Sequence, residues 1–290
     1  MTGVDIAYLD TTYLGPKHTF PDQDLVINGC AEYVRAVCEG EEAWTELVLR
    51  AMQEKGRKNM EDLGKWMTKL EEDPTQRKED TSEKPKKYKV LICVGTYLIG
   101  KERIFQAIAE RLGAKIWANE YKRGILNVLG DAPLKERLTA QQGEAQVHLC
   151  RLGEVTNPDG LCRYLVNMLQ HGYTHVMAFR PTGWTFKPTS AAAVTSWTPV
   201  PQLVTRDGKV AVFGVPYSEH SNFYELRAFV KAYFRSKQVI PTVNVGSPKS
   251  RERMSYWIDR WREEARKEWQ ETGTVNAAVL FPTAAEKAHL

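Results

Sequence analysis

The sequence predicts an α/β protein with a mainly parallel sheet at its centre. Segments 88–94 (YKVLICV) and 174–179 (THVMAF) are short and almost continuously apolar, which is typical of strands buried on both faces of a parallel sheet. Apolar residues at helical spacing follow Gly100 and Asp159, so a helix is expected after each of these positions. Because strands and helices alternate along the chain, a parallel sheet covered by helices is the favoured class.

The remaining elements follow from the same patterns. They are strands at 6–9, 145–149, 209–214 and 239–243, and a helix around 223–234. A final helix begins at Pro248, directly after the expected N-cap Ser247, and runs to about Gln270. Basic and acidic side chains alternate along this last helix, which we interpret as a solvated surface in preference to a DNA-binding face.

One region, between residues 39 and 87, interrupts the alternation of strands and helices. It contains two amphipathic helical patterns, the first around Trp44 and the second around Leu63. A polar run follows at 71–87 and has no apolar periodicity, which is typical of a disordered linker. We interpret the whole region as a surface insertion in preference to an element dedicated to partner binding.

Composition restricts the class of protein. The chain has 290 residues, of which 42% are hydrophobic and 26% charged, and these fractions are those of a soluble globular protein. No segment approaches the roughly 20 apolar residues of a membrane span, and the start lacks a secretory signal. Five cysteines without CxxC spacing predict reduced thiols, so an intracellular protein is expected. The net charge of +4 permits an anionic partner without requiring one.

Two candidate functional residues lie where predicted strands end. His220 stands in GVPYSEHSNFY at a strand-to-helix turn, and an imidazole there can ligate a metal or, when protonated, offset phosphate charge. An isolated histidine more often makes a local hydrogen bond. Asp10 ends the strand at 6–9, where α/β active sites gather, and it can also cap the turn that follows.

Two further strand ends carry candidate phosphate contacts. The turn GTYLIGK ends at Lys101 and offers backbone amides to an anion, although simple turn geometry explains it equally well. It is not a P-loop, because Glu102 stands where a P-loop has Ser or Thr. Arg180 and Thr182 in AFRPTGW leave another strand, and arginine suits bidentate phosphate recognition. We expect Trp184 of the same string to pack in the core.

Four strings in this order, LDTTY, AFRPTGW, GVPYSEHSNFY and PTVNVG, resemble the metallo-β-lactamase/β-CASP DNA nucleases. This DNA cross-link repair family includes Artemis, and the likeness is closest to its 5′-exonucleases. The resemblance implies a β-CASP cap joined to the C-terminal portion of a metallo-β-lactamase αββα fold. It divides the chain into a metallo-β-lactamase remnant at 1–16, a β-CASP domain at 17–215 with the insertion 39–87, and a C-terminal metallo-β-lactamase segment with its tail at 216–290.

The resemblance also implies roles for single residues. Asp10 corresponds to the acidic motif A residue, which orients the metal-site machinery, and His220 to the motif B histidine beside the second metal. Val243 stands at motif C, where RNA-cutting relatives have histidine, and therefore implies DNA as the substrate. Ser221 is a phosphate-contacting hydroxyl, together with the side chains proposed at the other strand ends (Lys101, Arg180 and Thr182). Asn222 replaces a serine that is usual in the family.

In such nucleases the HxHxDH loop, a further histidine and a GDFR-type aspartate precede LDTTY, which begins here at Leu9. The chain is therefore expected to be a C-terminal part with only Asp10 and His220 of the metal site, to bind no stoichiometric zinc by itself and to be inactive alone. The intact relative would be a zinc-dependent nuclear DNA repair exonuclease acting on 5′-phosphorylated single-stranded or cross-linked DNA. A catalytically inactive DNA-binding or scaffold module is the alternative, and Val243 disfavours RNA processing.

Overall fold

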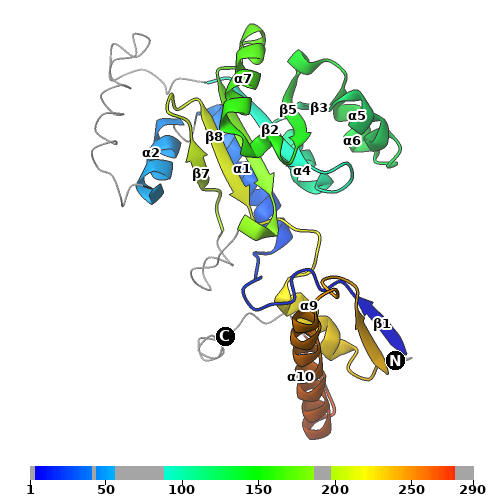
Figure 1. The fold of residues 1–290 in the computed structure, drawn as a ribbon. Helices are drawn as coiled ribbons and strands as arrows, with labels where there is room; N and C mark the ends of the chain where they lie inside the picture. Colours follow the sequence, from blue (N-terminus) through cyan, green and yellow to red (C-terminus); the bar gives the residue numbers. More distant parts are fainter. Residues whose placement is uncertain (1–3, 41–43, 56–87, 186–196, 278–290) are drawn as a thin grey trace. The chain divides into compact units, whose positions relative to one another are not determined.

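The computed structural model describes residues 4–40, 44–55, 88–185 and 197–277. The chain separates into two compact units (Figure 1). Among the described residues, the smaller unit contains 4–21 and 218–277, and the larger unit contains 22–40, 44–55, 88–185 and 197–217. No helix within these described ranges has the length and apolar character to cross a membrane.

The larger unit is built on a seven-stranded sheet of order β4-β3-β5-β2-β6-β8-β7. Its strands are β2 (Val90–Thr96), β3 (Lys115–Trp117), β4 (Leu138–Thr139), β5 (Ala145–Arg151), β6 (His175–Pro181), β7 (Pro201–Val204) and β8 (Val210–Val215). Every neighbouring pair is parallel except β7 and β8, which are antiparallel. The predicted α/β class with a mainly parallel sheet is confirmed, and the short strands β3, β4 and β7 were not predicted.

Helices connect and cover these strands. They are α1 (Gln23–Glu39), α2 (Trp44–Lys55), α4 (Glu102–Arg111), α5 (Glu120–Asn127), α6 (Ala132–Arg137) and α7 (Pro158–Met168), with short 3-10 turns η3 (Gln142–Glu144), η4 (Glu154–Thr156), η5 (Leu169–His171) and η6 (Gly183–Thr185). Within the insertion predicted for 39–87, the first helical pattern forms α2. The second pattern and the polar run at 71–87 lie outside the described residues.

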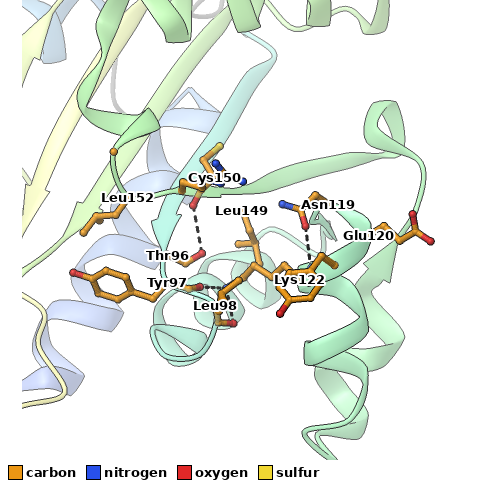
Figure 2. A pocket seen from close by; sticks show the side chains of 12 residues that line it. Thr96, Tyr97, Leu98, Asn119, Glu120, Lys122, Leu149, Cys150 and Leu152 are labelled. Atoms are coloured by element: carbon orange, nitrogen blue, oxygen red, sulfur yellow. Dashed lines mark hydrogen bonds between the residues drawn. The ribbon is translucent and has the colours of Figure 1, made fainter.

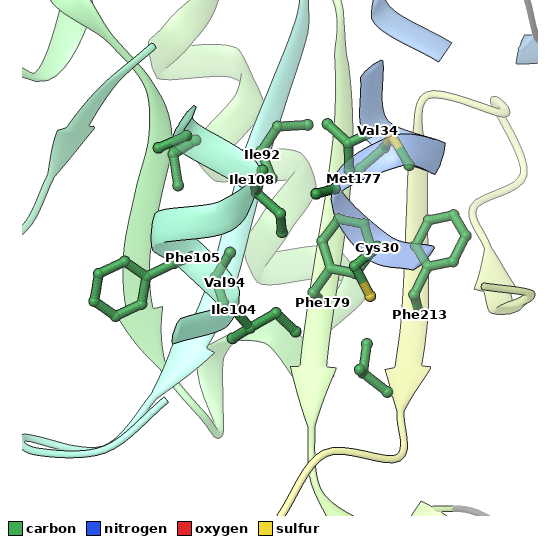
Figure 3. Packing of buried hydrophobic residues seen from close by; sticks show 14 of the residues in the cluster. Cys30, Val34, Ile92, Val94, Ile104, Phe105, Ile108, Met177, Phe179 and Phe213 are labelled. Atoms are coloured by element: carbon green, nitrogen blue, oxygen red, sulfur yellow. The ribbon is translucent and has the colours of Figure 1, made fainter. Parts of the chain in front are cut away.

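Strand β2 shows why the sheet has helices on both faces. All seven of its residues are buried. Because successive side chains of a strand point to opposite faces, Ile92 and Val94 pack with α1 and α4, whereas Leu91 and Cys93 pack with α7. Figure 3 shows the first of these layers, with Cys30 of α1 close to strand residues of the sheet. The apolar run therefore fills two separate cores, as expected for a central parallel strand.

The chain leaves the neighbouring parallel strands β2 and β5 toward opposite edges of the sheet. From β2 the chain passes through α4 to β3, and from β5 it passes through α7 to β6. Since α4 and α7 cover opposite faces, the carboxyl ends of β2 and β5 form a topological switch point of the sheet. Open α/β sheets characteristically have a ligand-binding crevice at this position.

The smaller unit contains a two-stranded parallel sheet of β1 (Ile6–Leu9) and β9 (Gln238–Pro241). Helices α9 (Phe223–Ala232) and α10 (Pro248–Thr272) pack together around Trp261, which is 1% exposed. The expected apolar stripe of α10 is confirmed by its buried residues Met254, Ile258, Trp261 and Ala265. Ser247 is the N-cap of α10, as expected, although its side chain makes no capping hydrogen bond.

Candidate functional site

Asp10 and His220 lie side by side in the smaller unit although 210 residues separate them in the sequence. Asp10 directly follows β1, and His220 lies in the loop before α9. The distance between His220 Nδ1 and Asp10 Oδ2 is 2.8 Å, and the two side chains are 51% and 46% exposed. The folded chain therefore brings together the two residues expected to serve a metal site and leaves both accessible to a ligand.

Asp10 is held in place by the turn that follows β1. Its Oδ1 atom accepts hydrogen bonds from the Thr12 amide at 2.8 Å and from the Thr12 hydroxyl at 2.6 Å. Partial burial acts to raise the pKa of Asp10, but the hydrogen bonds from Thr12 and His220 outweigh it, so the pKa lies below its usual value. The capping role foreseen for Asp10 and its contact with His220 are thus fulfilled by different oxygen atoms of one carboxylate.

The loop that carries His220 is fixed on both sides of the histidine. Before it, the Ser218 hydroxyl accepts a hydrogen bond from the His220 amide at 3.1 Å. After it, buried Asn222 and exposed Glu225 form a capping box that starts α9. The side-chain oxygen of Asn222 is therefore committed to the helix, while Ser221 between the two is exposed.

Aromatic and basic residues surround the pair. The buried ring of Tyr13 lies 6.0 Å from the His220 ring and 5.1 Å from the His18 ring, measured between centroids. Burial lowers the pKa of His18, and the positive charges of Lys17 and Arg253 lower it further. The sequence places Tyr13 within LDTTY and gives no signal for His18, because nothing in the spacing of either residue points to the histidine of a distant loop.

The contact with Asp10 determines which nitrogen of His220 is available. When the Nδ1–H group of His220 donates a hydrogen bond to the Asp10 carboxylate, Nε2 of the neutral ring is the acceptor, and this tautomer is assigned from the hydrogen bond. Histidines that ligate a metal through one ring nitrogen commonly donate a hydrogen bond from the N–H of the other to a carboxylate in this way. The described part of the chain, however, contains no group of three or more His, Cys, Asp or Glu residues able to hold a metal ion. A zinc site needs about three or four ligands, so the described residues do not complete one.

Val243 contributes to this region through its backbone. Its carbonyl oxygen accepts a hydrogen bond from the hydroxyl of buried Thr11 at 2.7 Å, while its side chain is half-buried. The neighbouring Thr242 amide donates to the Leu9 carbonyl at 2.9 Å. These two hydrogen bonds join the ends of β1 and β9 next to Asp10.

Arg180 and Thr182 lie in the larger unit, at the carboxyl end of β6. The Nε atom of Arg180 is buried and has no hydrogen-bond partner among the described residues. The Thr182 amide donates to the Val215 carbonyl at 2.8 Å, at the end of the neighbouring strand β8. Trp184 is 63% exposed, so its expected place in the core was wrong. Strand β6 ends at Pro181, and the following turn carries the tryptophan out of the sheet.

Lys101 is placed differently from the other candidates for phosphate binding. It is only 5% exposed, and its Nζ lies 3.4 Å from the Tyr217 carbonyl and 5.0 Å from the centre of the Tyr217 ring. The Gly100 amide donates to a Glu102 carboxylate oxygen at 2.8 Å. A carboxylate of the protein thus occupies the anion position at the start of α4, and the geometry gives the predicted phosphate contact of this turn no support.

Comparison with known proteins adds an independent observation. Residues 133–247 match the family described as DNA repair metallo-beta-lactamase. The chain is similar to the DNA cross-link repair protein pso2/snm1 of Schizosaccharomyces pombe, with 31% identity over 90% of this chain and 40% of the relative. It is 32% identical to the DNA cross-link repair protein SNM1 of Arabidopsis thaliana over 89% of this chain and 42% of that protein.

A human relative shows the same pattern. The DNA cross-link repair 1A protein of Homo sapiens is 32% identical over 90% of this chain and 20% of its own length. The chain therefore spans less than half the length of each of these three relatives. Their sequences align with nearly all of this chain, including the regions on both sides of the matched domain.

Proposed function

This chain belongs, through residues 133–247, to the DNA repair metallo-beta-lactamase family, and from that premise we propose that it serves as the β-CASP region and part of the active site of a DNA cross-link repair nuclease. We assign residues 17–215 to the β-CASP domain, with the insertion 39–87. The segments 1–16 and 216–290 then belong to the metallo-β-lactamase fold. The similarity to three cross-link repair proteins over about nine-tenths of the chain supports this assignment.

The Asp10 and His220 pair is the observation that carries the proposal. The Asp10 carboxylate orients the imidazole, so that His220 Nε2 is left to bind a cation or, as a protonated group, to face a phosphate. The family implies a metal, and we propose zinc, which would activate water for attack on a phosphodiester when bound. The described residues contain no group of three or more possible metal ligands. We therefore propose that Asp10 and His220 form part of a metal site and do not form a complete one.

DNA is the proposed substrate, as a 5′-phosphorylated single strand or a cross-linked duplex, and the nucleus is the proposed location. Three of the relatives are named for DNA cross-link repair, and another, 27% identical over 152 residues, is named 5′ exonuclease Apollo in Rattus norvegicus. Val243 at the motif C position supports DNA over RNA. Arg180 supports phosphate binding, since its guanidinium has a donor without a partner among the described residues. Ser221 and Thr182 are proposed as weaker hydroxyl contacts.

The test is a nuclease assay on 5′-phosphorylated single-stranded DNA with the natural protein that contains this chain. His220→Ala should reduce cleavage at least a hundredfold, because it removes the imidazole that Asp10 holds, and about 3 kcal/mol of transition-state stabilisation corresponds to that factor. The melting temperature should change little, because the side chain is half exposed. His171→Ala, at another exposed histidine, is the matched control. Cleavage by His220→Ala at the parent rate would show that the assignment of this residue is wrong.

A catalytically inactive DNA-binding module is the second candidate. It is favoured by the small number of potential metal ligands that the described part of the chain places around His220, which is below that of a zinc site. The two candidates differ in one measurement: a binding module retains salt-sensitive affinity for single-stranded DNA and shows no cleavage that EDTA abolishes.

A further inference from the structure

A crevice at the topological switch point of the larger sheet takes no part in the site around His220. Its volume is about 1140 Å³, and it lies at the carboxyl ends of β2, β3 and β5 (Figure 2). Sites that bury a small ligand measure roughly 300–1,000 Å³, so this crevice has room for a nucleotide. We propose that it binds one nucleotide of a DNA strand. The inference rests on the proposed function for its ligand, but it concerns residues that the proposed active site does not use.

Two tyrosines give the crevice the surface that a nucleobase requires. Tyr97, directly after β2, is 59% exposed, and Tyr121, in the first turn of α5, is 68% exposed, and both line the crevice. An aromatic side chain left in solvent at the edge of a concave site offers a flat apolar face. Stacking on such a face recognises any base, because every base has a π-face.

The crevice also offers groups for the polar parts of a nucleotide. Arg151 ends β5 with an exposed side chain whose guanidinium makes no hydrogen bond or ion pair within the described residues. The side-chain oxygen of Asn119 accepts a hydrogen bond from the Lys122 backbone amide at 2.9 Å. The side-chain NH₂ group of Asn119 is left as a donor at the rim of the crevice. Arginine suits the phosphate, and the amide suits a base edge or sugar. Glu120 is the acidic residue of the lining, and Arg151 is its exposed basic residue.

The walls of the crevice are held in position by buried polar contacts. Lys122 is 5% exposed, and its Nζ donates to the carbonyl oxygens of Tyr97 and Leu98, which fixes the backbone on which Tyr97 stands. The Thr96 hydroxyl donates to the Cys150 carbonyl at 3.4 Å and links the ends of β2 and β5 (Figure 2). A site that is formed before the ligand arrives loses less conformational entropy on binding.

The combination of features selects a nucleotide over an acidic peptide. A peptide carboxylate would use Arg151 alone and would leave both tyrosine faces in water. A nucleotide uses the ring faces, the guanidinium and the amide together. A free mononucleotide offers the same chemistry as a nucleotide within a strand, so the experiment contains an arm for each.

The experiment measures the affinity of the full chain for a labelled single-stranded oligonucleotide by fluorescence anisotropy. Tyr97→Ala and Tyr121→Ala should each weaken binding about tenfold, which corresponds to about 1.4 kcal/mol. Tyr256→Ala, at a tyrosine of α10 that is 56% exposed, is the matched control and should bind as the parent does. Arg151→Gln should weaken binding and lower its dependence on salt. An abasic strand should bind the parent and Tyr97→Ala with equal affinity, because it has no base to stack.

A second arm titrates a deoxynucleoside monophosphate and follows the intrinsic tyrosine fluorescence. If Tyr97→Ala and Tyr121→Ala lower the affinity for both ligands, the crevice is a site for the nucleotide itself. If they lower the affinity for the strand alone, it is a site for the DNA chain. If the parent binds DNA while Tyr97→Ala and Tyr121→Ala keep its affinity in both arms, the inference is overturned and the proposed function stands. If the parent binds neither ligand, both fall.

Discussion

The two carboxylate oxygens of Asp10 make different hydrogen bonds, and each has its own role in the site. One oxygen of its carboxylate caps the turn at Thr12, and the other orients His220. The neighbouring Thr11 uses its hydroxyl for a different purpose, since it bonds the Val243 carbonyl across the sheet. Three successive residues thus connect the site to its own turn, to a histidine and to the segment that follows β9.

Thr11→Val tests the bond between the ends of β1 and β9. Valine keeps the shape of threonine but cannot donate, so the Val243 carbonyl loses its partner and the free energy of unfolding should fall by about 1–3 kcal/mol. Val243→Ala should cost about 1 kcal/mol or less, because its side chain is only half-buried and its carbonyl remains. Denaturant unfolding of both variants provides the comparison. A larger loss in Val243→Ala than in Thr11→Val would contradict this account.

The residues of the site are more predictable from the sequence than their partners are. Asp10 and His220 stand in recognisable strings, and the structure brings them together. The burial of Lys101 was not foreseeable, because its neighbour Tyr217 is 116 residues away and periodicity does not report such contacts. The exposure of Trp184 was missed for a related reason, since the end of a strand depends on its neighbours in the sheet.

Among the elements, long apolar runs were predictable and short edge strands were not. Strands β2 and β6 are central and buried, so their composition alone identifies them. Strands β3 and β4 have three and two residues, too few to show any alternation. Strand β7 pairs with β8 in antiparallel fashion at the sheet edge, and its partner is set by tertiary contacts that the sequence pattern does not contain.

An ion pair between α9 and α10 predicts how the stability of the folded protein changes at low pH. Lys231 of α9 has a side chain 7% exposed, and its Nζ lies 2.5 Å from Oε1 of Glu268 on α10. Partial burial acts to raise the pKa of Glu268, but the hydrogen bonds from Lys231 and Asn276 dominate, so the pKa lies below the ordinary value of 4.5. A lowered pKa in the folded state means that the pair stabilises the protein above about pH 4.5 and that this contribution is lost as the pH falls through the lower folded value.

Glu268→Gln should therefore lower the melting temperature at pH 7. The free energy of unfolding is expected to fall by an amount on the order of 1 kcal/mol, a value reduced because the carboxylate is partly exposed to solvent. The difference between parent and variant should shrink as the pH is lowered through 4, which thermal melts across this range would show. Glu271→Gln, at an exposed position of the same helix, is the control. A difference that stays constant with pH would refute the role of the pair.

For the whole molecule, the division into two units separates the chemistry as well as the cores. Asp10 and His220 belong to the smaller unit, whereas Arg180 and the crevice belong to the larger one. Each unit has its own buried apolar cluster, so each has a physical basis for its own stability. A variant in the crevice is therefore expected to leave the packing around His220 unchanged.

Metal content tests the molecule as a whole. The purified chain should hold far less than one zinc ion per molecule, because the pair at Asp10 does not reach the number of ligands that zinc requires. Elemental analysis after dialysis against trace zinc measures this directly, with His220→Ala as the comparison. About one zinc per chain in the parent, lost in His220→Ala, would show that further ligands join the pair.

The parallel pairing of β1 with β9 has a consequence for how the protein is made. The hydrogen bond that joins the ends of these strands connects residues 232 positions apart, and the whole of the larger unit lies between them. At roughly 5–20 residues per second, a ribosome exposes β1 on the order of ten seconds or more before β9 exists. During that interval β1 is an unpaired edge that can associate with other nascent chains. Because the site around Asp10 and His220 is assembled from distant segments, the nascent chain spends a longer time with this strand edge unprotected.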